Sequence, residues 1–275
     1  MESFIANVQI RKVANENAID TDDLLAVEEP LEIQLLCGNA DERQQKSISV
    51  TMRTPGNDEE LAAGFLFTEG IIRNNREILF IKKNSLDHNR ILVGLQENVN
   101  PHIQKLERNF YTTSSCGVCG KSSIDAIKTI SAYINEPDAI CLKTEMVYSI
   151  HSQIRERQAI FNSTGGLHAS ALFDMEGNFI MLHEDVGRHN ALDKVIGASL
   201  LNEELPLTNT ILLLSGRVSF ELIQKACMAG IKVITAVGAP SSLAVELAKE
   251  SNITLIGFLR NERFNIYSGR ERIMM

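Results

Sequence analysis

Two cysteines, Cys116 and Cys119, stand two residues apart in the stretch Ser-Ser-Cys-Gly-Val-Cys-Gly-Lys, which ends at Lys121. A pair at this spacing can belong to a zinc site, a redox disulfide or a reactive thiol. A structural zinc site needs four ligands, and no second pair of suitable spacing accompanies this one. A thioredoxin-type switch is expected near the N-terminus of its domain, whereas this pair lies in the middle of the chain.

A reactive thiol suits the surrounding residues. Ser122 and Ser123 can cap a helix whose apolar residues recur at helical spacing, so the thiols precede a helix N-terminus. That position and Lys121 would lower a thiol pKa from about 8.5. An incidental pair on an exposed loop remains the alternative. The other cysteines stand in apolar surroundings and are expected to be buried: Cys37, Cys141 and Cys227.

A second set of candidate residues follows the strands predicted in the last third of the chain. Strands at 211–214, 232–237 and 254–259 alternate with helices at 219–229 and 241–250, which predicts parallel strands joined by right-handed crossovers. Phosphates bind beyond the carboxyl ends of such strands, where helix N-termini gather. The arginines there could make forked contacts to phosphate, although each could equally be a solvated charge: Arg217, Arg260 and Arg263.

Histidines and carboxylates gather in the stretch from His183 to Asn190, between a strand predicted at 179–183 and a helix at 188–200. They could hold a divalent metal or act as an acid/base pair, but the spacing matches no standard zinc signature. Alternatively, Asp185 caps the helix and Arg188 pairs with a carboxylate. His168, after a glycine break, is expected to be a hydrogen-bonded core residue.

The first hundred residues predict strands around one helix. Residues 47–52 alternate as a half-buried strand, Asn57 can cap a helix that Gly70 ends, and residues 77–82 and 90–95 predict two more strands. One further helix is expected at 145–161, followed by a strand at 167–173.

The composition excludes several classes of protein. The chain has 275 residues and a formal net charge of −8 at pH 7, so a nucleic-acid partner bound over a broad face is not expected. No apolar run approaches the roughly 20 residues of a membrane span, and residues 1–12 interleave apolar with polar side chains instead of forming a leader. The expected location is the cytoplasm.

Several blocks together resemble the formate dehydrogenase accessory sulfurtransferase family, FdhD, over residues 46–268. The blocks are Met52-Arg-Thr-Pro-Gly56, Cys116-Gly-Val-Cys-Gly-Lys121, Thr164-Gly-Gly-Leu-His-Ala169, His183-Glu-Asp-Val-Gly-Arg-His-Asn190, Leu214-Ser-Gly-Arg-Val-Ser-Phe-Glu221, Ala239-Pro-Ser-Ser-Leu243 and Phe258-Leu-Arg-Asn-Glu-Arg263.

This resemblance implies a sulfur carrier. Cys116 would accept persulfide sulfur from a cysteine desulfurase, with Cys119 assisting or resolving it. The sulfur would pass to the molybdenum of the bis(molybdopterin guanine dinucleotide) cofactor before that cofactor enters formate dehydrogenase. The cofactor-contacting segment of the family falls on Phe258, Leu259, Arg260, Asn261, Glu262 and Arg263, beside the strand end that carries Ser215, Gly216 and Arg217.

The resemblance also implies a cytidine deaminase-like α/β core at residues 111–275, a smaller N-terminal α+β lobe at 1–110, and a homodimer. Deaminase zinc chemistry is not expected, because the order of the motifs is reversed and Ser170 stands where the catalytic glutamate would be; no permanent metal is predicted. Two alternatives remain: a cofactor chaperone that tolerates loss of both cysteines, and a metal-dependent hydrolase using His183, Asp185 and His189.

Overall fold

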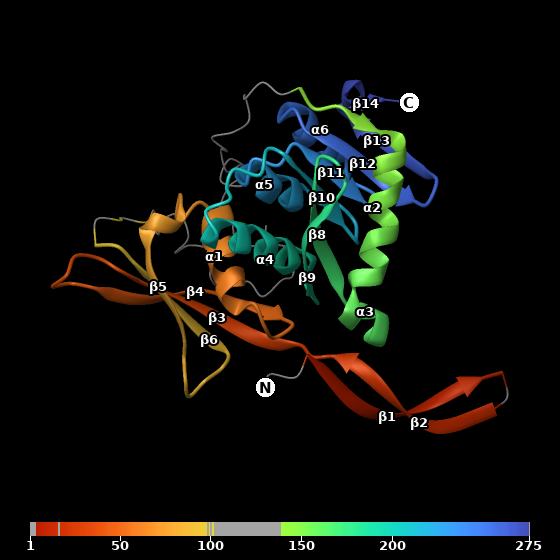
Figure 1. The fold of residues 1–275 in the computed structure, drawn as a ribbon. Coiled ribbons are helices and arrows are strands. Elements are labelled where there is room, and N and C mark those ends of the chain that lie inside the picture. Colours follow the sequence, from red (N-terminus) through yellow and green to blue (C-terminus); the bar gives the residue numbers. More distant parts are fainter. Residues whose placement is uncertain (1–3, 16, 98, 100, 102–138, 275) are drawn as a thin grey trace.

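The computed structural model describes residues 4–15, 17–97, 99, 101 and 139–274. Cys116, Cys119, the helix predicted after Ser123 and the predicted boundary at residue 110 lie outside the described residues. Helices and strands alternate around a central sheet, with a second sheet and a long hairpin built from the first hundred residues (Figure 1). This confirms a mixed α/β class. None of the described helices has the length and apolar character needed to cross a membrane.

The central sheet has six strands and mixed direction. Its middle strands are parallel, as predicted, because buried parallel strands read as continuous apolar runs. The outer strands run antiparallel to their neighbours, which alternation of strands and helices did not predict. The strand order is β13 (Arg263–Ser268), β12 (Thr254–Arg260), β11 (Val233–Ala236), β10 (Thr210–Leu214), β8 (His168–Asp174) and β9 (Phe179–Asp185).

Helices cover both faces of this sheet. On one face lie α4 (Arg188–Leu201), α5 (Phe220–Met228) and α6 (Ser242–Glu250), and on the other lies α2 (Thr144–Arg157). The helix predicted at 145–161 is confirmed over residues 145–157, but its predicted end is wrong, because the chain breaks at Gln158 and restarts as α3 (Ala159–Thr164). Glu184 stabilises the restart by accepting hydrogen bonds from the backbone N–H groups of Ile160 and Phe161, at 3.0 and 2.9 Å.

The second sheet holds β4 (Gln44–Arg53), β3 (Glu29–Cys37), β6 (Arg90–Leu95) and β5 (Ile78–Lys83), in that order. A short turn of 3-10 helix, η1 (Asn75–Glu77), leads into β5. The last turn of this kind, η4 (Arg270–Arg272), precedes β14 (Ile273–Met274), which pairs with β7 (Leu142–Lys143).

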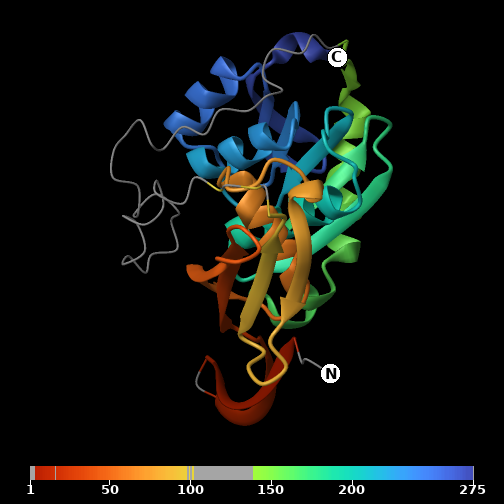
Figure 2. The same ribbon diagram turned by 90° about the vertical axis from the view of Figure 1, so that its left-hand side faces the viewer.

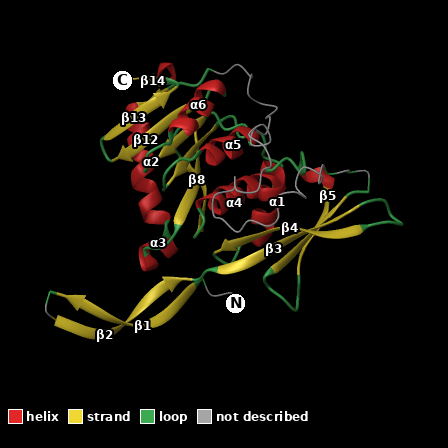
Figure 3. Ribbon diagram, turned by 180° about the vertical axis from the view of Figure 1, so that it is seen from behind, coloured by secondary structure: helices red, strands yellow, loops and turns green. Residues whose placement is uncertain are grey.

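Helix α1 (Asp58–Thr68) and α4 pack together between the two sheets (Figures 1 and 3). A Cβ atom at Gly64 would lie 1.9 Å from the carbonyl oxygen of Asp193, so only glycine allows this crossing. The hydrophobic cluster around the two helices includes residues of both sheets. Asn57 precedes α1, but its left-handed backbone turns the side chain to Glu60 rather than to a backbone N–H, so the predicted side-chain cap is wrong.

A hairpin of β1 (Ile5–Ala14) and β2 (Asn17–Ala26) extends beyond the rest of the molecule (Figures 1 and 2). At its root, the carbonyl of Phe4 accepts a 3.0 Å hydrogen bond from Val27, and the Phe4 ring packs on Gly56. The hairpin is therefore fixed to the turn that precedes α1.

Candidate functional site

The topology of the central sheet brings the candidate residues of the last third to one edge. Strands β10, β11 and β12 end there, β9 also ends there, and β8 and β13 begin there. His168 pairs with Asp185 in the ladder, and Ser215 follows β10 directly beside them. We call this the sheet edge, defined by residues 168, 185, 215–217, 238–241 and 258–263.

Backbone hydrogen bonds tie the loops of the sheet edge into a row. The N–H of Gly238 donates to the carbonyl of Gly216, and the N–H of Phe258 donates to the carbonyl of Gly238, each at 3.1 Å. A Cβ atom at Gly238 would lie 2.5 Å from the Gly216 oxygen, so the row requires glycine at this position. Phe258 has a φ of 55°, and its side chain remains 43% exposed. A non-glycine residue in this conformation is strained and needs support from its surroundings.

The predicted cofactor segment divides into side chains that brace the edge and side chains that face solvent. Both Nη1 bonds of Arg260 go to carbonyls, of Val237 and Leu259, at 2.8 Å. Leu259 is fully buried, so its side chain belongs to the core. Asn261 is held by His151 of α2, with 3.0 Å between Oδ1 and Nδ1. Glu262 is exposed in the turn before β13.

Arg260 and Arg263 stand directly opposite each other in the β12–β13 ladder, and both are exposed. Like charges in opposed positions destabilise a strand pair. An anion bound between them would offset that repulsion. The opposed pair therefore supports anion binding more strongly than either arginine alone.

Two more arginines, Arg188 and Arg217, lie near His168 at the other end of the sheet edge. Burial lowers the pKa of His168 below 6.5, and the nearby guanidinium groups of Arg188 and Arg217 lower it further. Gly216 makes room for the ring, since a Cβ atom there would lie 2.9 Å from His168 Nδ1. Within the described residues, the buried Nε of Arg188 has no hydrogen-bond partner.

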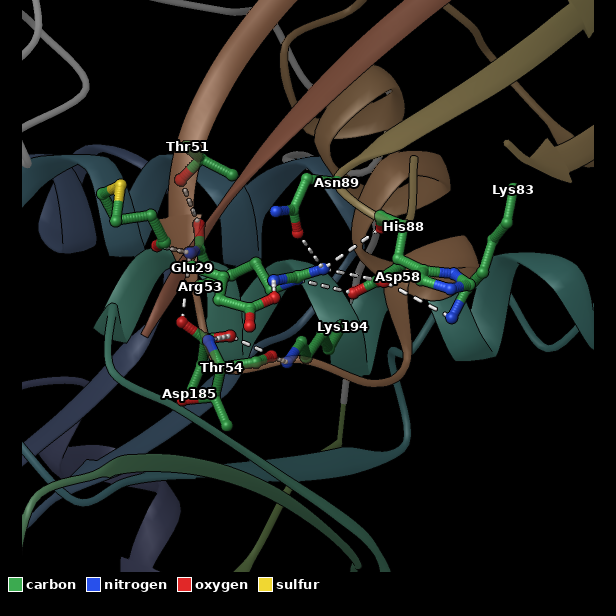
Figure 4. A network of polar contacts seen from close by, with 12 residues as sticks. Glu29, Thr51, Arg53, Thr54, Asp58, Lys83, His88, Asn89, Asp185 and Lys194 are labelled. Atoms are coloured by element: carbon green, nitrogen blue, oxygen red, sulfur yellow. Dashed lines mark hydrogen bonds and ion pairs between the residues drawn. The ribbon is translucent and has the colours of Figure 1, made fainter. Parts of the chain in front are cut away.

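Asp185 fastens the sheet edge to the turn that follows β4 (Figure 4). One carboxylate oxygen accepts from the N–H of Gly187 at 2.8 Å and from Asn190 Nδ2 at 3.1 Å. The other accepts from the N–H of Thr54 at 3.2 Å and lies 2.7 Å from Lys194 Nζ. Because both oxygens are occupied, Asp185 positions the start of α4 and is not available as a metal ligand.

The same network continues toward the second sheet and α1 through Arg53, the last residue of β4. Arg53 is 1% exposed and bonds the carboxylate of Asp58 at 3.0 and 3.3 Å. Figure 4 shows Glu29 and Asn89 completing its surroundings. Burying a charge is costly unless it is paired, and Arg53 is bonded by the side chains of Asp58, Glu29 and Asn89.

The histidines of the predicted metal site do not assemble with Asp185 into a ligand set. Burial lowers the pKa of His183, while His189 Nε2 lies 3.3 Å from Ser219 Oγ and 3.9 Å from Glu221. Across the described part of the chain, no group of three histidine, cysteine, aspartate or glutamate residues could hold a metal ion.

The three cysteines in the described residues have different environments. Cys37 and Cys227 are buried, as predicted, and burial raises the pKa of both thiols. The prediction for Cys141 is wrong: it is exposed, because the apolar stretch around it alternates and Leu142 takes the buried position. A cavity of about 310 Å³ lies away from the sheet edge, beside the start of β12 and the end of β13.

The chain is similar to known proteins along most of its length. The model of the FdhD/NarQ family matches residues 26–274. A relative from Mycolicibacterium paratuberculosis, named sulfur carrier protein FdhD, is 48% identical over 263 residues, covering 93% of this chain and 94% of its own. A protein of the same name from Saccharolobus solfataricus is 40% identical over 262 residues, covering 95% of both chains.

A solved structure agrees over the whole length. The crystal structure of a protein from Desulfotalea psychrophila, described as a candidate formate dehydrogenase accessory protein, has a TM-score of 0.76 and 27% identity, covering 99% of this chain and all of its own. Family model, relatives and structure agree, and the chain belongs to the FdhD/NarQ family.

Proposed function

We propose that this chain is a sulfur carrier that serves formate dehydrogenase by delivering sulfur to the bis(molybdopterin guanine dinucleotide) cofactor, with a cysteine desulfurase as donor. Membership of the family and the shared name of its relatives support sulfur carriage. The donor, the cofactor and the transfer chemistry are the finer parts of the proposal. The cytidine deaminase-like core, the homodimer and the cytoplasmic location stay predictions.

The observation that carries the cofactor assignment is the meeting of positive groups and glycine loops at the sheet edge. Arg260 opposes Arg263 across the hairpin, and Arg188 and Arg217 both lie near His168. Guanidinium groups bind phosphate oxygens in a forked geometry, and the guanine dinucleotide halves of the cofactor carry phosphates. The exposed Phe258 ring offers a flat apolar surface beside them.

The proposed chemistry uses the two cysteines that lie outside the described residues. The thiolate of Cys116 attacks the outer sulfur of the donor persulfide; the donor S–S bond breaks, the donor leaves as a thiolate, and Cys116 carries the persulfide. Release as sulfide needs two electrons. The thiolate of Cys119 supplies them by attacking the inner sulfur, which forms a Cys116–Cys119 disulfide and frees hydrosulfide for the molybdenum. A cellular dithiol then reduces the disulfide.

Intact-mass measurement tests the carrier step. After incubation with a cysteine desulfurase and cysteine, the protein should gain the mass of one sulfur, and Cys116→Ala should abolish the gain. No gain, or a gain that survives the substitution, contradicts the proposal. If Cys116→Ala/Cys119→Ala still restored formate dehydrogenase activity, the chain would be a cofactor chaperone without sulfur chemistry.

Calorimetry with GDP tests the sheet edge separately. Arg217→Ala and Arg263→Ala should each weaken GDP binding about 10- to 150-fold, since a hydrogen bond to a charged group contributes about 1.5–3 kcal/mol. Arg73→Ala is the matched control, because Arg73 is exposed on the N-terminal lobe. Unchanged affinity in both edge variants would remove the phosphate site from this edge.

A further inference from the structure

The tip of the β12–β13 hairpin carries the two opposed arginines of the sheet edge, but few ladder contacts hold it. The ladder shifts register between Gly257 and Arg260. Beyond that irregularity, the described ladder continues with the single pair of Arg260 and Arg263, whose charges repel each other. A tip of this kind needs contacts from outside the ladder to keep one conformation.

The β12 side of the tip is held from within the central sheet. Arg260 Nη1 donates hydrogen bonds to the carbonyls of Val237 and Leu259, both at 2.8 Å. The side chain of Leu259 is fully buried in a hydrophobic cluster that also contains Ile150 and Ile154 of α2. These contacts fix the end of β12, where the turn begins.

Helix α2 holds the turn itself and the start of β13. This helix covers the face of the central sheet opposite α5 and α6 (Figure 1). Tyr148 and His151 are three residues apart, so they lie on the same side of the helix. The ring of Tyr148 packs on Phe264, with 5.3 Å between the centroids, and His151 Nδ1 lies 3.0 Å from Asn261 Oδ1. Helix α2 therefore contacts both ends of the segment 261–264.

The bond between His151 and Asn261 joins a buried group to an exposed one. His151 is 6% exposed, whereas Asn261 lies on the surface. An amide oxygen only accepts hydrogen bonds, so His151 Nδ1 carries the hydrogen and donates it. Asn261 directly follows Arg260 in the two-residue turn that leads to Arg263. A side chain anchored in the protein interior thus fixes the turn that connects the two arginines.

We propose that His151 is a positioning residue of the anion site: through Asn261 it keeps Arg260 and Arg263 at a separation that one phosphate group can bridge. This role rests on the proposed function, in which phosphates bind at these arginines. His151 itself does not touch the anion. It raises the fraction of molecules whose turn already has the binding conformation, and the apparent affinity is proportional to that fraction.

Calorimetry with GDP on the full chain tests this role with two opposite substitutions. His151→Leu keeps an apolar side chain but removes the donor, and should weaken GDP binding about three- to tenfold, as expected for one hydrogen bond. His151→Asn loses the packing of the ring, but its Nδ2 can stand where Nδ1 stood, so binding should stay within about twofold of the wild type. A residue that acted only by packing would give the reverse order. Ser152→Ala, an exposed change on the same helix, should bind GDP like the wild type.

A double-mutant cycle tests whether His151 acts through Asn261. Asn261→Ala should weaken GDP binding, and His151→Leu should cause no further loss in that variant, because the bond is already broken. Without nucleotide, the backbone amides of residues 261–264 should exchange hydrogen faster in His151→Leu than in the wild type or in His151→Asn. Circular dichroism melting checks that each variant folds. Asn261→Ala alters an exposed side chain, so it tests the bond even if His151→Leu does not fold.

The outcomes separate the positioning role from the anion site. Wild-type affinity in His151→Leu, while Arg263→Ala weakens binding, would overturn the role of His151 and leave the site in place. Additive losses in the double variant, a His151→Asn that binds more weakly than His151→Leu, or an Asn261→Ala with wild-type affinity and exchange would also overturn it. A wild type that binds no GDP, or whose affinity survives both Arg217→Ala and Arg263→Ala, would overturn the anion site, and the role of His151 with it.

Discussion

Lys194→Met keeps most of the apolar stem of a side chain that is 2% exposed, but removes its ammonium group. In the wild type this group lies 2.7 Å from Asp185 and donates a 2.9 Å hydrogen bond to the carbonyl of Thr54. The variant leaves Asp185, which is fully buried, with N–H donors but without its cation. Removing one partner of a buried ion pair costs about 3–5 kcal/mol.

Urea unfolding and thermal melting measure this loss. For a chain of this size, about 2–4 °C of melting temperature accompanies each kcal/mol, so Lys194→Met should melt about 6–20 °C lower than the wild type. Lys83→Met is the matched control. The Lys83 side chain is 32% exposed, and Asp58, 3.4 Å from it, keeps its bond to Arg53. The control should lose less than about 1 kcal/mol.

The double variant Asp185→Asn/Lys194→Met decides whether the two residues act as a pair. Each single variant leaves a buried group of its partner uncompensated, whereas the double variant leaves none, so its loss should be smaller than the sum of the two single losses. Because Asp185 also holds Gly187 and Asn190, Lys194→Met should weaken GDP binding as well. A loss below about 1 kcal/mol for Lys194→Met, or additive losses in the double variant, would refute this reasoning.

Two further predictions concern the sheet edge. Gly238→Ala should cost about 1–3 kcal/mol in urea unfolding, since its Cβ would lie 2.5 Å from the carbonyl oxygen of Gly216, while Gly166→Ala, with no atom closer than 3.8 Å, should cost less. NMR titration should place the pKa of His168 below 6.5 and move it upward in Arg188→Gln, because one repelling charge is gone. Below about pH 6.5 the unfolded chain binds a proton at His168 that the folded chain resists, so the free energy of unfolding should decrease as the pH is lowered through this range. A His168 pKa that does not move in Arg188→Gln would contradict the placement of Arg188 beside it.

The last third of the fold could be predicted because its signals are local. Strand β10 reads Thr-Ile-Leu-Leu-Leu, a continuous apolar run, and Ser219 and Ser241 precede the two following helices. These features predict parallel strands, and the carboxyl ends of neighbouring parallel strands lie at the same edge of a sheet. The meeting of Ser215 to Arg217 with Phe258 to Arg263 follows from that order alone.

Features that depend on distant partners could not be predicted in the same way. The break at Gln158 is stabilised by Glu184, 24 residues from Ile160 in the chain, and nothing in the local periodicity announces it. Asp185 looked like a metal ligand or a helix cap, and its bond to Gly187 is indeed local. The backbone N–H of Thr54, 131 residues earlier, donates to the other carboxylate oxygen of Asp185, and this distant contact is what excludes Asp185 as a metal ligand.

The hairpin of β1 and β2 is a third case: its sequence alternates between apolar and polar residues, but this alternation does not indicate which surface covers the apolar side. Val8 and Ile10 alternate with polar residues, which is the period of a strand with one apolar face. The same alternation requires that one face of the strand be covered. On that face Ala6, Val8 and Ile10 are half-buried, whereas Ile19 nearer the tip is 61% exposed, so the face is covered more toward the root than toward the tip. A period in a sequence thus indicates which residues share a face, and only the fold shows how far its own chain covers that face.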